Sequence, residues 1–520
     1  MRKPQSIQSL EARNLAYQQS IENPEAFWGD IAEQFTWQRK WDRVLDWNFE
    51  EPRVRWFDGA QLNITENCLD RHLVDKAEDL ALIWESNDPT EPSKSYSYRE
   101  LHEAVCIFAQ ALRNEGIAKG DRVCLYMGMV PELAIAVLAC ARIGAIHSVI
   151  FGGFSAQSVS DRVNDAQAVA IITCDGAYRG AKDIALKSVI DEALTQCTSV
   201  KKVWVYQRTN TAISIQPGRD ILWSDSIDAV NIAQALSTPA ETMEAEDPLF
   251  ILYTSGSTGK PKGVVHTCAG YMVWTNYTFT QTFQYQPGWI HFCTADIGWI
   301  TGHSYILYGP LCAGTTTLMF EGIPTYPSPN RFWEVVEKHE VDILYTAPTA
   351  IRSLMGAGDD WVHRHAMPSL KVLGTVGEPI NAEAWHWYHE KVGKSRCEIV
   401  DTWWQTETGG ILITNLAGVT PSKPTYATLP LPGVEPLLVD EYGIEISGNN
   451  VSGNLCIRRP WPGILRTTWG DHERCKQTYF STYPGLYFTG DGALRDENGF
   501  YRITGRVDDV LNVSGHRIGT

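Results

Sequence analysis

The sequence predicts an α/β fold: mostly parallel sheets covered by helices in two subdomains, plus a smaller β subdomain. Two observations predict this fold class. Short apolar runs alternate with helical patterns between about residue 80 and residue 400, as in parallel sheets whose strands are buried on both faces. After about residue 420 the pattern changes to short strands joined by Gly, Pro and Asn turns, which indicates a compact β unit.

The first α/β segment has clear start and stop signals. Pro131 stands in the first turn of an apolar helix and Gly144 follows its end, the usual asymmetry between the two ends of a helix. Ser155 is a suitable cap for a second helix. We therefore predict strands at 122–127, 145–151 and 169–173 and helices at 131–143 and 155–166.

The strand pattern returns in the second half of the chain. Further on, two strand-like runs flank Asn498 and Gly499, and an Asn-Gly pair in this position is a strong hairpin signal. We predict strands at 250–253, 342–345, 370–375 and 398–400, and a hairpin formed by 487–495 and 500–504.

These patterns divide the chain into parts. Residues 1–75 contain five tryptophans, from Trp28 to Trp56, without any βα rhythm, and we predict an extension packed on the main body. The α/β subdomains are expected at 76–419 and the β subdomain at 420–507.

Charge and cysteine usage exclude several classes of protein. The formal net charge is −17, without a Lys/Arg cluster beyond short local pairs, so we expect no nucleic acid or membrane as partner. Arg142 cuts short the most apolar stretch, far below the ~20 residues that span a bilayer. Twelve cysteines are scattered without a C-x-x-C pair, which argues against a zinc site and fits a cytoplasmic location. The oligomeric state stays open.

A loop of small residues follows the strand predicted at 250–253. Residues 254–263 read TSGSTGKPKG, with three glycines, four hydroxyls and two lysines. Glycines let the backbone approach a ligand, and amides together with hydroxyls can wrap polyphosphate oxygens. The loop is not a Walker motif, because Pro261 stands where the magnesium-binding Ser or Thr belongs. We predict a phosphate-binding loop.

Two further loops follow predicted strands: VGEP at 376–379 and DTWWQTETGG at 401–410. Ligands bind at the carboxyl ends of strands in open α/β sheets. We interpret Trp403 and Trp404 as pocket walls and Glu407 as a Mg²⁺ ligand, since Mg²⁺ is usually held by one or two carboxylates plus phosphates. The alternative, that the tryptophans are ordinary core aromatics, stays open at this point.

The C-terminal region places isolated charges between glycines. Asp491 lies in YFTGDG, Arg506 in GRVDD and Arg517 in SGHR. An Asp in such a turn is most often a turn former. Asp491 could instead bind two sugar hydroxyls, and the two arginines could hold phosphate oxygens.

Together these segments resemble the acyl-CoA synthetases that activate acids through adenylates, and most closely those that act on acetate. The resemblance extends from about residue 20 to the end of the chain. Its blocks are FGGFSA (151–156), TSGSTGKPKG (254–263), TADIGWITGHSY (294–305), LYTAPTAIR (344–352), VGEPIN (376–381), DTWWQTETGG (401–410), DHERCKQTYFST (471–482) and the C-terminal run 487–520.

The resemblance implies roles for the matching residues. ATP and AMP would be bound by Thr254, Ser255, Gly256, Ser257, Thr258, Gly259, Lys260, Gly377, Glu378, Pro379, Asp401, Thr402, Trp403, Trp404, Gln405, Thr406, Asp491, Arg506 and Arg517. The acyl pocket would be lined by Ile300, Thr301, Val376 and Trp404. Coenzyme A would contact Gly152, Gly153, Arg179, Lys182, Thr301 and Ser514. The catalytic residues would be Arg517, Lys262 and Glu407, with Glu407 also holding Mg²⁺.

The implied activity is that of an AMP-forming acetate–CoA ligase that uses ATP, Mg²⁺ and coenzyme A. Mg²⁺ on Glu407, together with Arg517, would neutralise the charge that develops as a carboxylate attacks ATP. Trp404 would close the acyl pocket, so acetate is expected over propionate. Two positions depart from the family pattern. Many relatives carry valine in place of Ile300, and some carry arginine in place of Lys182, which cannot make arginine's bidentate fork.

The resemblance also implies a hinge at Asp508, followed by a C-terminal lid with an adenylating lysine in an S-G-K segment. Residues 508–520 match the hinge and the start of the lid, and no S-G-K segment follows. We therefore expect residues 1–520 to form the adenylate slowly. Two other readings remain. One is a kinase that makes an acyl phosphate, which Pro261 disfavours; the other is a lidless adenylate-binding module without turnover.

Overall fold

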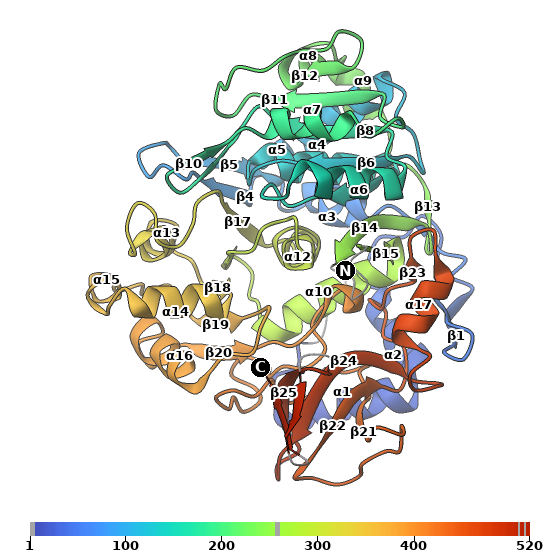
Figure 1. Ribbon diagram of the computed structural model, residues 1–520, viewed down its shortest axis with the longest axis vertical. Coiled ribbons are helices and arrows are strands. Elements are labelled where there is room, and N and C mark those ends of the chain that lie inside the picture. The colour runs from blue at the N-terminus through green and yellow to red at the C-terminus, as the bar shows by residue number, and fades with distance from the viewer. Residues whose placement is uncertain (1–5, 255–260, 508–509, 514–515, 520) are drawn as a thin grey trace.

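The computed structural model describes residues 6–254, 261–507, 510–513 and 516–519, the last two ranges without side chains. Its largest sheet has eight strands, of which the first six are parallel (Figure 1). In spatial order they are β12 (Asp220–Leu222), β11 (Lys202–Tyr206), β8 (Ala170–Cys174), β6 (Arg122–Tyr126), β7 (Ile146–Val149), β14 (Pro248–Thr254), β15 (Lys262–Thr267) and β23 (Thr467–Thr468). The three strands predicted in the first α/β segment are thus confirmed.

A second sheet has seven strands, all parallel except the last. In spatial order they are β20 (Glu398–Asp401), β19 (Val372–Thr375), β18 (Ile343–Thr346), β16 (Ile290–Cys293), β17 (Thr316–Phe320), β4 (Leu80–Glu85) and β5 (Lys94–Ser97). The strands predicted at 342–345, 370–375 and 398–400 lie side by side at one end of this sheet, so the predicted α/β class is confirmed.

The smaller β unit is a four-stranded antiparallel sheet of β21 (Pro436–Val439), β22 (Val451–Ile457), β24 (Tyr487–Arg495) and β25 (Tyr501–Arg506). Its last two strands form the hairpin predicted across Asn498 and Gly499. Strand β23 lies in the same stretch of sequence but joins the eight-stranded sheet, so the β unit and the first α/β unit are interlocked. Four two-stranded pairs complete the strands: β1 (Arg43–Asn48) with β2 (Arg53–Asp58), β3 (Gln61–Leu62) with β13 (Met243–Glu244), β9 (Ala177–Arg179) with β10 (Lys182–Ile184), and β26 (Val510–Val513) with β27 (His516–Gly519).

Helices cover both faces of the eight-stranded sheet. The connections β6 to β7 and β7 to β8 run in opposite directions, so right-handed crossovers place their helices on opposite faces. Those helices, α5 (Pro131–Arg142) and α6 (Ala156–Ala166), were both predicted, and the Ser155 hydroxyl caps α6 by accepting from the Ser158 N–H at 3.3 Å. The other helices of this half are α4 (Tyr98–Asn114), α7 (Leu186–Leu194), α8 (Trp223–Asp228) and α9 (Ile232–Ser237).

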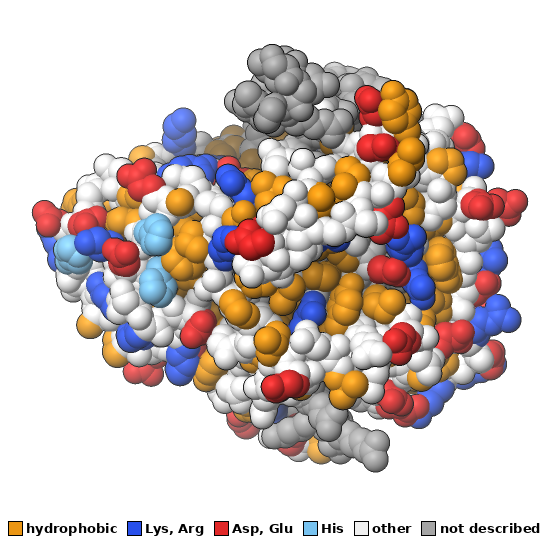
Figure 2. Space-filling view, turned by 90° about the horizontal axis from the view of Figure 1, so that it is seen from below, with side chains coloured by type: hydrophobic (Ala, Val, Ile, Leu, Met, Phe, Trp, Pro, Cys, Tyr) orange, Lys and Arg blue, Asp and Glu red, His pale blue; other side chains and the backbone are white. Residues whose placement is uncertain are grey.

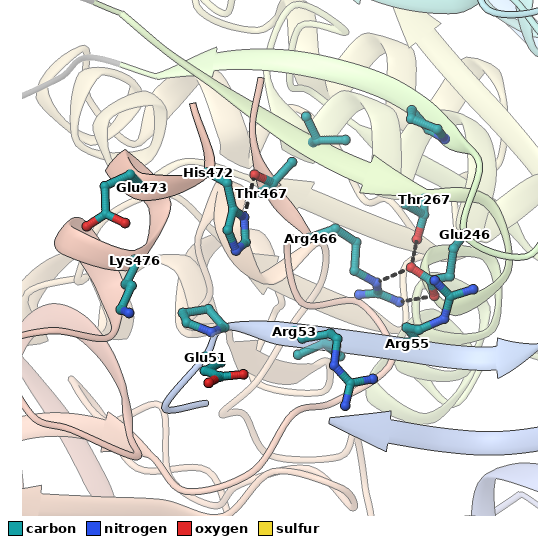
Figure 3. Close-up of a pocket in the computed structure, with 14 residues that line it drawn as sticks. Glu51, Arg53, Arg55, Glu246, Thr267, Arg466, Thr467, His472, Glu473 and Lys476 are labelled. Atoms are coloured by element: carbon teal, nitrogen blue, oxygen red, sulfur yellow. Dashed lines mark hydrogen bonds and ion pairs between the residues drawn. The ribbon is translucent and has the colours of Figure 1, made fainter. Parts of the chain in front are cut away.

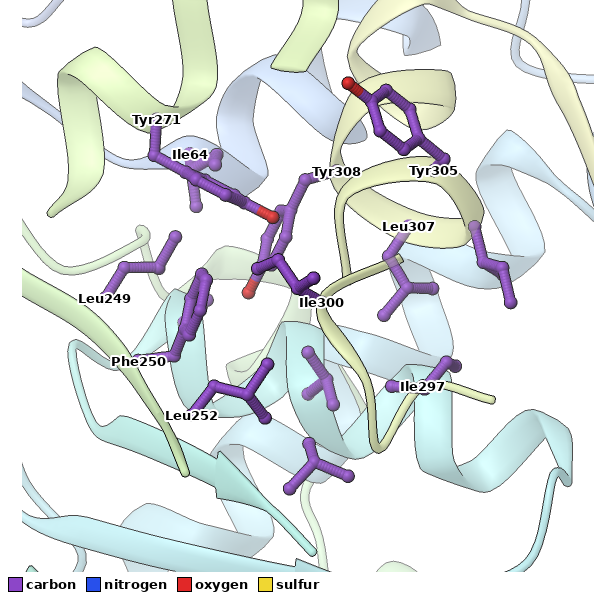
Figure 4. Packing of buried hydrophobic residues seen from close by; sticks show 14 of the residues in the cluster. Ile64, Leu249, Phe250, Leu252, Tyr271, Ile297, Ile300, Tyr305, Leu307 and Tyr308 are labelled. Carbon is purple, nitrogen blue, oxygen red and sulfur yellow. The ribbon is translucent and has the colours of Figure 1, made fainter. Parts of the chain in front are cut away.

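The second half contains one long buried helix, α10 (Cys268–Phe283), and several short ones. These are α11 (Ile300–Gly302), α12 (Gly309–Ala313), α13 (Arg331–Lys338), α14 (Pro348–Gly356), α15 (Asp360–His363), α16 (Ala382–Trp387) and α17 (His472–Tyr479), with π-helical turns at His303–Tyr308 and Tyr388–Val392. Side chains of β14, α10 and the segment 297–308 interlock in the core between the two large sheets (Figure 4).

The N-terminal segment packs on α10 and on the β unit through buried side chains. It contains α1 (Leu10–Glu22), α2 (Pro24–Ala32) and α3 (Ile64–Cys68). Trp28 on α2 is fully buried, with its ring centroid 5.5 Å from that of Trp274 on α10. The Ser20 hydroxyl accepts from the Gly433 N–H at 2.7 Å, which ties α1 to the β unit.

The surface shows no segregation of charge on the face in Figure 2, where basic side chains are interspersed with acidic and hydrophobic ones outside the grey regions. In the part of the chain that the structure describes, no helix has the length and apolar character that a bilayer span requires.

Candidate functional site

A cavity of about 800 Å³ lies where the carboxyl ends of the two large sheets meet. Met127 and Gly152 follow strands β6 and β7 of one sheet, and Thr294 and Val376 follow β16 and β19 of the other. Ligand sites in open α/β sheets form at this edge. The predicted site residues that line the cavity are Gly152, Arg179, Ile300, Thr301, Val376, Gly377, Trp404, Gln405 and Thr406.

Trp404 forms a fixed wall of this cavity. Its Nε1–H donates to the hydroxyl of Tyr345 at 3.2 Å, and its ring meets Tyr305 edge-on with centroids 5.0 Å apart. Ile300 and Val376 are 7% and 6% exposed and line the same cavity. All four residues predicted for the acyl pocket therefore surround one space, and its aromatic wall is held from behind.

Residues 376–379 bring backbone rather than charge to the cavity. Gly377 lines it with a φ of +97°, a conformation that residues with a side chain rarely adopt. The carboxylate of Glu378 instead accepts from the Arg352 guanidinium at 3.0 Å. Neither Glu378 nor Pro379 lines the cavity.

The first two residues of the segment 401–407 anchor this segment to the neighbouring strand β19. Asp401 accepts from the Thr375 hydroxyl at 2.7 Å, and burial raises the pKa of its carboxyl to about 7. The Thr402 hydroxyl donates to the Thr375 carbonyl O at 2.7 Å. Both side chains are buried and neither lines the cavity, because β20 delivers them into the sheet. In the structure these two side chains brace the strand end, and the nucleotide contact expected of Asp401 and Thr402 stays a prediction.

Asp491 is the centre of a hydrogen-bonded cluster beside this segment. Its Oδ2 accepts from Trp403 Nε1 at 3.1 Å and from Gln405 Nε2 at 2.9 Å. Arg506 Nη1 lies 3.5 Å from Oδ1. Burial is the main cause that raises the pKa of the Asp491 carboxyl to about 6. Trp403 is thus a supporting residue here, while Gln405 reaches both Asp491 and the cavity.

Glu407 and Lys262 are joined by a residue that the sequence did not single out. The Tyr479 hydroxyl donates to Glu407 Oε1 at 2.5 Å and accepts from Lys262 Nζ at 3.1 Å. Lys262 Nζ also lies 4.9 Å from the centroid of the Tyr479 ring. Burial lowers the pKa of the Lys262 ammonium. Tyr479 belongs to the block at 471–482, which was the signal available in the sequence.

The flanks of the predicted phosphate loop lie beside the segment 401–407. His266, on the strand that Lys262 begins, places Nε2 at 2.7 Å from the carbonyl O of Thr406. Thr254 ends β14, and its buried Oγ1 has no hydrogen-bond partner among the described residues. The predicted residues Ser255, Gly256, Ser257, Thr258, Gly259, Lys260, Asp508 and Ser514 lie outside the described part of the chain, as does the side chain of Arg517.

Arg179 and Lys182 lie opposite each other on the β9–β10 hairpin, remote from β24 in Figure 1. Arg179 lines the cavity, with its Cζ 4.8 Å from the centroid of the Phe151 ring. Within the described residues, neither cation forms an ion pair with a carboxylate. Gly152 lines the cavity, whereas Gly153 and Lys182 do not.

Asp296 is a cavity residue to which the sequence assigned no role, although it belongs to the block at 294–305. Its Oδ1 accepts from the Gly298 N–H at 2.7 Å. Burial raises the pKa of this carboxyl to about 6, against an opposing effect of Arg179. The Asp296 carboxylate is therefore charged at neutral pH, and it lines the same cavity as Arg179.

A second cavity, of about 530 Å³, lies between β2, β15 and α17 (Figure 3). Arg466 and Glu246 pair there at 2.7 Å, and Arg53 and Arg55 pair with the aspartates Asp46 and Asp58. Among the described residues, none that was predicted for the site lines this second cavity. Its strongest charges are already matched by neighbours, so we place the functional site in the larger cavity.

The surroundings of Glu407 suit a Mg²⁺ ion that is held partly by substrate, rather than a metal ion that is held by protein side chains alone. Within the described residues there is no group of three or more His, Cys, Asp or Glu side chains placed to hold a metal. Mg²⁺ is usually held by one or two carboxylates while substrate phosphates and water fill the remaining positions. Glu407 has one oxygen engaged by Tyr479, which leaves the other for a cation.

Comparison with known proteins finds matches along nearly the whole chain. Residues 69–467 match the model of the family described as AMP-binding enzyme, and residues 14–68 match that of the acetyl-coenzyme A synthetase N-terminus. The acetyl-coenzyme A synthetase of Alkalilimnicola ehrlichii is 56% identical over 505 residues, 97% of this chain and 77% of the relative. That of Halorhodospira halophila is 54% identical over 524 residues, 99% of this chain and 80% of the relative.

The fold is also found in a solved structure. Acetoacetyl-CoA synthetase from Streptomyces lividans superposes with a TM-score of 0.88 at 24% sequence identity, covering 97% of this chain and 76% of that one. At this identity the likeness concerns the fold alone.

Proposed function

The chain belongs to the AMP-binding enzyme family, and we propose that it is an AMP-forming ligase that activates acetate with ATP and passes the acetyl group to coenzyme A. The observation that carries the proposal is the shared cavity. One space is bounded by the Trp404 wall, by Gln405 and Thr406 of the segment beside Glu407, and by Arg179 of the hairpin. Relatives that are more than half identical carry the name of this activity.

The proposed reaction has two steps, the first at the α-phosphorus of ATP and the second at the carbonyl carbon of the acetyl group. In the first, an acetate oxygen attacks the α-phosphorus of ATP, the bond from that phosphorus to the bridging oxygen breaks, and pyrophosphate leaves. In the second, the deprotonated thiol of coenzyme A attacks the carbonyl carbon and AMP leaves with the former acetate oxygen. Both steps bring anions together, so fixed positive groups near the reacting atoms lower the barrier.

Named residues would supply that charge and hold the substrates. Lys262 and the loop that precedes it would bind the leaving pyrophosphate, and Glu407 would hold Mg²⁺ beside it. Mg²⁺ would supply neutralisation of phosphate charge at this position. Asp491 would accept hydrogen bonds from ribose hydroxyls. Tyr479 keeps the Lys262 ammonium and the Glu407 carboxylate apart by standing between them.

The strand arrangement disfavours the kinase reading. A P-loop connects a strand to a helix whose N-terminus faces the phosphates. Here β14 is followed by β15, which runs antiparallel to it within the same sheet. The loop 254–263 therefore joins two strands of a hairpin, and hydroxyls and lysines would have to replace the helix dipole.

The acyl pocket supports a preference for very short acids. Trp404 is pinned by Tyr345 and Tyr305, so it has little freedom to move aside for a longer chain. One methylene changes selectivity by about 10- to 200-fold in apolar pockets. We expect acetate to be preferred over propionate within that range, and butyrate to be poor.

A product assay tests this function. Purified protein is incubated with ATP, Mg²⁺, coenzyme A and acetate, propionate or butyrate, and nucleotides and thioesters are separated by chromatography. We expect AMP, pyrophosphate and acetyl-CoA, with acetate the best acid. ADP with an acyl phosphate would establish the kinase instead, and AMP binding without any turnover would favour the adenylate-binding module. The expected slow adenylation by residues 1–520 finds no support in the comparisons and stays a prediction, as does the cytoplasmic location.

A further inference from the structure

We propose that Asn87 is a positioning residue for coenzyme A, because it clamps the turn of the β9–β10 hairpin that carries Arg179 and Lys182. The inference rests on the proposed function and on the coenzyme A contacts that the resemblance implies for Arg179 and Lys182, which we assign to the phosphates of coenzyme A. It adds a residue from a distant part of the chain that does not line the cavity.

The clamp consists of two hydrogen bonds between one side chain and one backbone unit. Asn87 Nδ2 donates to the Gly180 carbonyl O at 2.9 Å, and the Gly180 N–H donates to Asn87 Oδ1 at 2.8 Å. Asn87 is only 4% exposed, so water competes poorly for either bond. A carboxamide places a donor and an acceptor on two separate atoms of one short side chain, whereas an ionised carboxylate of similar size offers acceptors only.

Asn87 is itself fixed by a buried ion pair. Its N–H donates to Glu321 Oε2 at 3.1 Å, and Glu321 in turn accepts from Arg208 Nε at 2.7 Å and Nη2 at 2.8 Å. The Arg208 guanidinium carbon also lies 4.8 Å from the ring centroid of Tyr178 on β9. The hairpin is therefore attached twice to one network: at its turn through Asn87 and along β9 through Arg208.

The hairpin needs such an anchor. Its strands are three residues each, and an isolated two-stranded hairpin is marginal in water even when longer. Arg179 and Lys182 are directly opposite in the register, and like charges in that position repel. Neither forms an ion pair with a carboxylate in the described part of the chain. Asn87 and Arg208 therefore fix the backbone from which the two cations reach an external anion, while the Arg179 side chain also stacks on Phe151.

The test compares binding and the two half-reactions in Asn87→Ala. We expect the Kd of coenzyme A by calorimetry, and its KM, to rise roughly tenfold, since displacing a positioned group by about 1 Å can cost up to a hundredfold. AMP affinity and acetate-dependent pyrophosphate release should stay at the wild-type level. The KM for pantetheine, which carries the thiol but no phosphate, should not change either.

Three controls separate positioning from general destabilisation. Asn63→Ala removes another fully buried asparagine, whose Nδ2 donates to backbone carbonyls of Ala141 and Glu241, and should lower Tm without changing the Kd of coenzyme A. Asn87→Asp keeps the size and the acceptor but loses the donor at neutral pH, and should weaken coenzyme A like Asn87→Ala if the latter is too unstable to purify. In an Arg179→Ala background, Asn87→Ala should add much less than it does alone.

Wild-type affinity for coenzyme A in both Asn87 variants would overturn the inference while leaving the proposed function intact. An equal rise of the pantetheine KM would also overturn it, because the effect would then not concern the phosphates. Failure of the wild-type protein to bind coenzyme A or to make acetyl-CoA would instead overturn the proposed function, and with it the premise of this inference.

Discussion

At the proposed nucleotide end of the site, Glu407, Lys262 and Asp491 contact partners within the protein, whereas Arg179 and Lys182, at the proposed coenzyme A end, form no ion pair with a described carboxylate. The first group is held side chain to side chain. On the hairpin, the Arg179 side chain stacks on the Phe151 ring and the backbone is held by the Asn87 clamp on Gly180.

This difference follows from what each end has to do. Charge develops during the attack on ATP, and groups that stabilise a transition state act best when they are arranged beforehand. The phosphates of coenzyme A carry the same charge before and after the reaction. Cations that bind them therefore need only contribute to affinity, and they do not have to stabilise a transition state. Substitutions at the first end should therefore slow adenylation, and those at the hairpin should weaken coenzyme A.

The largest effect is expected from Glu407→Gln. Loss of a preorganised charge at a reaction centre costs about 10²- to 10³-fold in rate, so acetate-dependent pyrophosphate release in a single turnover should fall by that amount. Coenzyme A affinity should not change. Glu473→Gln, an exposed glutamate on α17, is the matched control. Nearly normal pyrophosphate release by Glu407→Gln would contradict the view that residues at the nucleotide end act on adenylation.

Trp404→Gly should change which acid is used. Removing the indole opens the space in front of Tyr345 and Tyr305, and the ratio of kcat/KM for butyrate to that for acetate should rise at least about tenfold. Competition assays with mixed acids measure this ratio directly. A variant that still accepted only acetate would show that another residue limits chain length.

Tyr479→Phe should have a smaller effect at the nucleotide end. It removes the hydroxyl between Glu407 and Lys262 and leaves the carboxylate oxygen without its donor; bonds to charged groups contribute about 1.5–3 kcal/mol. We expect the Kd of MgATP to rise roughly tenfold. Tyr442→Phe, at an exposed turn, controls for the substitution. Unchanged MgATP binding would mean that Tyr479 only fills space.

The smallest effect is a pH dependence from Asp491, whose pKa is raised by burial to about 6. Its carboxylate is charged above this pH, so AMP affinity should weaken several-fold from about pH 7.5 to about pH 5 through this group, and Asp491→Asn should lack that component. Because the folded pKa is above the unfolded one, the group's contribution to stability is full below about pH 4 and is lost as pH rises through about 6. Thermal melts of both proteins across this range check the sign.

Local signals predicted the elements well. Pro131, Gly144 and Ser155 marked helix ends that form as expected, and the Asn498-Gly499 turn closes the predicted hairpin. The acyl residues and residues 404–406 were also brought to one cavity, since carboxyl ends of parallel strands meet at one sheet edge.

Local sequence patterns could not predict hydrogen bonds between residues that lie far apart in the chain. Tyr479 is 72 residues from Glu407, and Asn87 is 93 residues from Gly180, so no periodicity links the members of either pair. A sequence motif also does not show which side chains turn into the sheet, as those of Asp401 and Thr402 do. Strand β23 pairs with β15, which lies about 200 residues earlier in the chain. No local pattern in the sequence indicates this pairing.

The most direct measurement follows one oxygen atom. Acetate labelled with ¹⁸O in its carboxylate is converted with ATP and coenzyme A, and the nucleotide products are weighed by mass spectrometry. If acetate attacks the α-phosphorus, AMP acquires one labelled oxygen and pyrophosphate acquires none. Label in an acyl phosphate or inorganic phosphate, together with ADP, would contradict an adenylate formed in this cavity.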